Sequence, residues 1–139
     1  MSTETTLLHD GSMIAAANYG NGASLSGPGG SGQYLAVIES TAADRTALLA
    51  SAIGQAAIGI LQNKPAAAQA ADVGFLGVSK FVAGGTITRG DKLMTDASGR
   101  LITWTAGSAY CQVGTARESA VVGQVSECFI HPAAVKVLT

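Results

Sequence analysis

Short apolar runs alternate with turns through the middle of the chain, from Ile58 to Arg100, and almost every turn contains Gly or Pro. This pattern is typical of short β-strands joined by tight corners. The first run, Ile58–Leu61, predicts a strand that is stopped near Lys64-Pro65, because proline fixes its own φ and keeps the preceding residue out of the helical region.

The longest run, Val73–Val82, predicts a strand that is apolar on both faces. Leu76 and Val78 point to one face, and Phe75 and Phe81 point to the other. A strand with one face in water alternates apolar with polar residues instead. We therefore expect both faces to be covered, by the rest of the domain and, as a further candidate, by another subunit.

A β-hairpin is predicted from Lys92–Thr95 and Arg100–Trp104. The intervening Asp96–Gly99 suits a type I turn, in which Gly99 takes the left-handed conformation. Period-two pairing then places Leu93 and Thr95 beside Leu101 and Thr103.

Further extended segments are predicted at Gln33–Glu39, Thr86–Thr88, Tyr110–Arg117, Val122–Ile130 and, as a last strand or tail, Val135–Leu138. The segment from residue 40 to 57 is ambiguous. Thr41 followed by Asp44 resembles a capping box, and Leu48, Leu49 and Ile53 have near-helical spacing, so the residues alone favour one short helix.

Residues 1–33 differ from the rest, with scattered apolar side chains in a background of Gly, Ser, Asn and Ala. We expect an extended N-terminal arm that buries its apolar side chains on a partner, followed by one domain over residues 34–139. A flexible N-terminus without a partner is the alternative. Gly27–Gly32 matches G-x-G-x-x-G but precedes a strand instead of following one, so it does not predict a dinucleotide site.

Charged residues make up only 12% of the 139 residues, 47% are hydrophobic, and the net charge is −1. So few charges leave part of the surface suited to an interface, and we expect an oligomer or an assembly-bound state. The cations are scattered singly, which argues against nucleic-acid and membrane-surface binding. No signal peptide is expected at Met1–Thr6, and the uncharged stretch Thr46–Asn63 is too polar to predict a membrane span.

The sequence offers no convincing catalytic, cofactor or metal site. Cys111 and Cys128 lack a paired-Cys motif, and His9 and His131 lie at opposite ends of the chain, so zinc-ligand spacings are absent. We expect free thiols, with a disulfide as a geometrically doubtful alternative. Acidic residues at Asp91 and Asp96 fit turn positions, so we predict no enzyme activity.

The central block resembles the small phage capsid proteins called cement or decoration proteins. The resemblance is carried, in order, by Ile58–Pro65, Gly77–Lys80, Gly84-Gly85, Gly90–Leu93 and Asp96–Arg100, and more weakly by Val113–Arg117. It also favours a strand at Thr46–Ala50 over a helix. It implies an all-β domain, a small β-sandwich or β-barrel of about eight to nine short strands, with the N-terminal arm outside it.

The family resemblance further implies a structural virion protein made in the cytoplasm of the bacterial host. Such proteins bind the outer surface of the assembled head between subunits of the major capsid protein and stabilise it, often as trimers, although a dimer is possible here. Candidate contacts to the capsid or to a neighbouring subunit are Leu7, Leu8, Met13, Ile14, Tyr19, Leu25, Tyr34 and Trp104. The alternative function is a carbohydrate-binding or adhesive surface module, with Trp104, Tyr110 and Tyr34 stacking on sugar rings.

Overall fold

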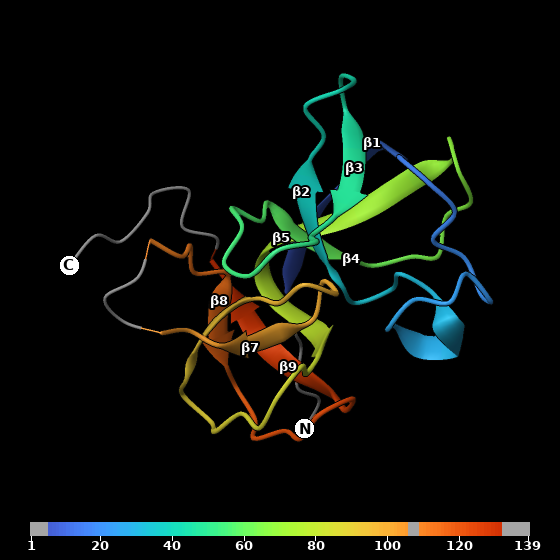
Figure 1. Cartoon of the computed structure of the whole chain (residues 1–139). Helices are drawn as coiled ribbons and strands as arrows, with labels where there is room; N and C mark the ends of the chain where they lie inside the picture. The colour runs from blue at the N-terminus through green and yellow to red at the C-terminus, as the bar shows by residue number, and fades with distance from the viewer. Residues whose placement is uncertain (1–5, 106–108, 132–139) are drawn as a thin grey trace.

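A computed structural model of the chain describes residues 6–105 and 109–131 (Figure 1). Nine strands form one sheet in these residues: β1 (Leu7–Ala15), β2 (Ala36–Glu39), β3 (Thr46–Leu49), β4 (Gly59–Leu61), β5 (Ala70–Val82), β6 (Lys92–Thr95), β7 (Leu101–Thr103), β8 (Gly114–Ala116) and β9 (Val125–Ile130). One turn of 3-10 helix spans Pro28–Gly30. The predicted all-β class is confirmed. No helix among the residues described is long and apolar enough to cross a membrane.

The long strand β5 takes part in two closed circuits of strands. In the first, hydrogen-bonded neighbours run β1-β3-β2-β4-β5, and a further pairing of β1 with β5 closes the circuit. In the second they run β5-β9-β8-β6-β7, and a bridge between Ala83 and Leu101 brings β7 back to the residue that follows β5. The fold is therefore two small barrels that share one strand.

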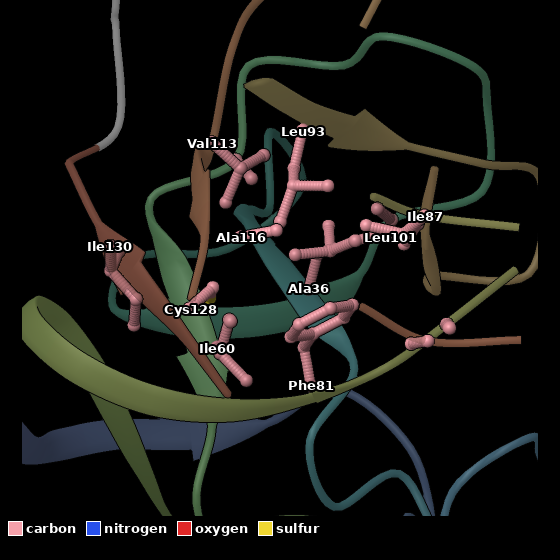
Figure 2. Close-up of a cluster of buried hydrophobic side chains, with 14 residues drawn as sticks. Ala36, Ile60, Phe81, Ile87, Leu93, Leu101, Val113, Ala116, Cys128 and Ile130 are labelled. Carbon is pink, nitrogen blue, oxygen red and sulfur yellow. The ribbon is translucent and has the colours of Figure 1, made fainter. Parts of the chain in front are cut away.

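Each circuit has its own hydrophobic core. The smaller core takes residues from all five strands of the first circuit, including Met13, Ala47 and Val73. The larger core takes residues from all five strands of the second, with Phe81 and Ile130 among its fully buried side chains (Figure 2).

The paired strands β2 and β4 lie between the two cores. Ala36 and Ile60 are directly opposite each other and belong to the larger core. Their chain neighbours Val37 and Leu61 belong to the smaller core. All four side chains are fully buried, because successive residues of a strand point to opposite faces and each face here meets a core.

The predicted hairpin is confirmed, with the first strand at its predicted bounds and the second strand one residue shorter at each end. β6 pairs with β7 so that Leu93 lies opposite Thr103 and Thr95 opposite Leu101. Gly99 has a φ of 81°, the left-handed conformation that the turn requires. Thr46–Leu49 is a strand, as the resemblance implied, and not the helix that the residues alone favoured. The predicted Val135–Leu138 lies outside the described residues.

The N-terminal stretch differs from the predicted arm, because part of it is a strand of the sheet. From Leu7 to Ala15 it is strand β1, which pairs in parallel with β3 and antiparallel with β5. Met13 and Tyr19 lie in the smaller core. The physical reason is that β1 supplies the ladder that closes the first circuit, so Met13 and Ala15 are buried within the chain while Leu8 and Ile14 stay exposed.

Gly77 sits where the two circuits meet on β5. It lies opposite Leu7 of β1 on one side and Ile130 of β9 on the other. Its φ is +120°, and a Cβ built on it would lie 2.1 Å from the carbonyl oxygen of Thr6. Only glycine fits this conformation and this close approach of three strands.

We expect Gly77→Ala to destabilise the fold by about 2–4 kcal/mol, because the added Cβ combines backbone strain with a clash against backbone atoms of the β1 ladder. The measurement is the midpoint of urea unfolding. Gly11→Ala is the matched control, since nothing lies within 4 Å of its Cβ position and its φ is not in the left-handed region. Equal midpoints for the two variants would contradict the role given to Gly77.

Candidate interaction surface

The histidines and acidic residues do not converge on one site. Among the described residues there is no pocket and no group of three His, Cys, Asp or Glu side chains placed to hold a metal ion. His9 Nδ1 is 2.6 Å from Asp72 Oδ1, which links β1 to β5 on the surface. His131 Nε2 is 2.7 Å from Thr115 Oγ1, beside β8 and β9. Each histidine thus has a local partner on its own ladder.

Cys111 and Cys128 are both free and buried. Cys128 lies opposite Ala116 in the β8–β9 ladder, whereas Cys111 precedes β8 and donates its backbone N–H to Gly54 O. Burial, with a smaller contribution from the neighbouring Glu127 carboxylate, raises the pKa of the Cys128 thiol to about 12. This thiol is a neutral core side chain at physiological pH.

The predicted contact residues fall into three groups by burial. Leu8 and Ile14 are exposed on β1. Met13 and Tyr19 are buried, so a contact through them requires opening the smaller core. The remaining candidates are partly buried: Leu25 packs against the smaller core, Leu7 and Tyr34 against the larger core, and Trp104 lies at the end of β7. Their contact roles stay predictions.

The three aromatic residues of the carbohydrate-binding alternative have internal partners. Trp104 Nε1 donates to the Tyr110 carbonyl oxygen at 3.0 Å. The Tyr110 ring covers Gly54, whose Cβ position lies 2.3 Å from that ring. Tyr34 packs against the larger core with Lys80 over its ring at 5.8 Å. Sugar stacking on these rings stays a prediction.

One outer face of the second circuit is a continuous row of cross-strand neighbours. Lys92 lies opposite Thr115, Thr115 opposite Phe129, and Phe129 opposite Val78. Directly opposed residues in an antiparallel sheet project to the same side. The row therefore crosses β6, β8, β9 and β5 on one face, and Phe129 is 47% exposed there.

The apolar part of this face continues along β5. Two residues before Val78, Leu76 lies opposite Leu8 of β1, and these leucines are 49% and 50% exposed. Phe75 is also exposed. The apolar pattern of this strand predicted cover on both faces, but within the described chain Leu76 and Phe75 remain exposed to solvent. Exposed apolar side chains that lie next to one another in this way are typical of a contact surface.

Charged side chains border the same face. Arg117 Nη1 is 3.6 Å from Glu127 Oε1, and the Arg117 guanidinium lies over the Phe129 ring at 5.0 Å. Lys80 lies opposite Glu127 in the β5–β9 ladder. With Lys92, the border holds three cations and one carboxylate. We name this surface the β5–β9 face and define it by the apolar residues Leu8, Leu76, Val78 and Phe129 with the border Lys80, Lys92, Arg117 and Glu127.

The fold of this chain is similar to that of a known protein structure. No protein-family model and no curated protein matches this sequence. Among solved structures, the chain is similar to the head fiber gp8.5 N base in bacteriophage phi29. The TM-score is 0.63 and the identity 17%, and the alignment covers 98% of this chain and 100% of that chain. At this identity the likeness establishes a shared fold over the full length.

We expect the alkaline loss of stability to depend on Cys128. The unfolded chain ionises this thiol near its ordinary pKa of 9.0, whereas the folded chain holds the proton up to about 12. The folded state therefore binds more protons between these values. The stabilisation is full below pH 9 and is lost as the pH rises through about 12, by about 2 kcal/mol at pH 10.5.

The measurement is the free energy of unfolding in urea at pH 8 and at pH 10.5. Cys128→Ala should lower stability at both values through the lost packing, yet show a smaller decline between them. Cys111→Ala is the control that keeps Cys128. An identical decline in the wild type and Cys128→Ala would show that another group causes the alkaline loss.

Proposed function

We propose that this chain is a structural protein of a phage virion that attaches to the head. The observation that carries the proposal is the shared fold with the phi29 head fiber base, which extends over nearly all of both chains. The sequence of the central block, Ile58–Arg100, also resembles phage cement proteins, which supports the same class of function.

The finer proposal is that the chain acts as a capsid cement protein. It binds the outer surface of the assembled head between subunits of the major capsid protein, as a homo-oligomer with a trimer favoured. The protein stabilises the head by mass action, because a ligand that binds the closed lattice and not its separated subunits shifts the equilibrium toward the lattice. Several copies in one oligomer increase the avidity of individually weak contacts.

A second candidate is an attachment base for a fibre. It is favoured by one observation, that the matched structure is itself a fiber base and is covered over its whole length. A base must hold the head firmly but need not stabilise it. The two candidates therefore differ in what happens to the heads once the protein is bound.

We expect purified protein to bind undecorated heads, seen as added density by electron microscopy, and to raise the temperature at which the heads open. Binding with a raised opening temperature supports the cement function. Binding with an unchanged temperature supports the attachment base. Absence of added density on the heads of its own phage contradicts both.

A deletion of residues 1–30 is a poor test of the head contact. It removes β1 and breaks the ladders with β3 and β5, so the loss of binding would follow from unfolding. Point substitutions at exposed positions of β1, such as Leu8→Ser, keep the ladder because backbone groups make its hydrogen bonds. These substitutions test the predicted contacts without removing a strand.

A further inference from the structure

The turn between β8 and β9 is unusually apolar. Val121 and Val122 are each 60% exposed, and Val125, the first residue of β9, is 40% exposed. Turn positions are ordinarily filled by Gly, Pro, Asn, Asp and Ser, because these residues suit turn backbones or hydrogen-bond to them. Val121 and Val122 are instead more exposed than any other large apolar side chain of the described residues.

The backbone of this turn is hydrogen-bonded within the chain. Gln124 N–H donates to Val121 O at 3.0 Å, and Gly123 between them has a φ of +83°, as at the third position of a type II turn. The Gln124 side chain closes the turn further, because its Oε1 accepts from Val121 N–H at 3.1 Å. Gly123 N–H donates to Ala83 O at 2.8 Å. Three N–H groups of the turn are therefore satisfied internally, and the valine side chains are what it presents outward.

Buried residues hold the turn against the larger core. Ala83 N–H donates to Gln124 O at 2.9 Å. Ile87 and Ala120 exchange both of their backbone hydrogen bonds, at 2.8 and 2.9 Å. Ala83, Ile87 and Ala120 are all buried members of the larger core. Because the turn is fixed before it meets a partner, little conformational entropy is lost when it binds.

The turn is continuous with the β5–β9 face. Alternate residues of a strand project to the same side, so Val125 and Glu127 point to the side of Phe129. Val125 lies opposite Val82, as Phe129 lies opposite Val78. The exposed apolar surface of the second circuit thus runs from the β5–β9 face to the turn, and the connection between β8 and β9 lies at the lower end of the molecule in Figure 1.

The size of the turn decides between a second copy and a larger partner. Its three valines expose on the order of 250 Å² at these exposed fractions, whereas each partner of a stable protein pair buries about 800 Å². Two copies that met through their turns alone would fall well short of that area. A protrusion of this size suits a small apolar pocket on a lattice, where several weak contacts act together.

We propose that residues 121–125 form a rigid apolar plug that inserts into an apolar pocket on the outer surface of the phage head. The inference rests on the proposed function, because the head supplies the pocket. The pocket is lined by aliphatic or aromatic side chains and has no charge at its floor, since a charge buried against valines would be left unpaired.

The test is the binding of the full chain and its variants to undecorated heads of its own phage. Val122→Thr keeps the β-branched shape and replaces one methyl group with a hydroxyl, so it removes apolar contact without removing volume. Val122→Ile keeps the apolar character. Leu48→Thr is the control, because Leu48 is 37% exposed on β3, which lies at the opposite end of the molecule in Figure 1. Circular dichroism and the urea midpoint check that each variant is folded.

Val122→Thr should weaken binding to heads by roughly tenfold for each copy, because a side chain buried in an apolar pocket gains an unpaired hydroxyl. Val122→Ile should bind more tightly than Val122→Thr. Leu48→Thr should bind as the wild type does, within about twofold, as exposed positions away from a contact usually do. Carbene footprinting should label residues 121–125 less on heads than in the free protein, with Leu48 labelled equally in both.

Three results would overturn the inference, and each has a different meaning. If the wild type and Val122→Thr bind heads equally well, the turn is not the contact, and the proposed attachment to heads stands. If Val122→Thr has a lower mass than the wild type in sedimentation equilibrium, the turn joins copies of the chain instead. If the wild type itself does not bind the heads, the inference and the proposed function both fail.

Discussion

The shared strand β5 is the constraint on which the rest of the structure depends. Its first half closes the circuit with β1 and β4, and its second half carries β9. The pairing partner of β5 changes from β1 to β9 at Gly77, which lies opposite Leu7 on one side and Ile130 on the other. If β5 were two separate strands, each half would be a small sheet with unpaired edges, and neither would enclose a core on its own.

This sharing explains the unusual composition of the chain. Strands that border two cores must bring backbones close together, and small residues allow it: the Cβ position of Gly59 lies 2.1 Å from the Gly74 carbonyl oxygen. Ala36 and Ala47 fill positions where a larger side chain would compete with the neighbouring core. The 18 glycines and the low charge are therefore properties of the packing as much as of the loops.

The sequence predicts the parts of the fold that obey local rules. The β6–β7 hairpin follows from turn chemistry and period two, and its register is correct. Strand β1 was missed because His9, Asp10, Gly11 and Ser12 interrupt its apolar pattern. Its pairing with β5 has register shifts at that point, and its partners lie far along the chain. No local signal encodes a ladder of this kind.

The sequence predicted the apolar part of the candidate surface but not its charged border. The apolar pattern on both faces of β5 predicted cover on both, but the structure leaves the consecutive residues Phe75 and Leu76 exposed. The charged residues that border this face are separate in sequence and come together only through the β6-β8-β9-β5 ladder order. The exposed side chains Leu8, Leu76 and Phe129 are nevertheless held in fixed relative positions, because backbone ladders join β1, β5 and β9 on both sides of Gly77.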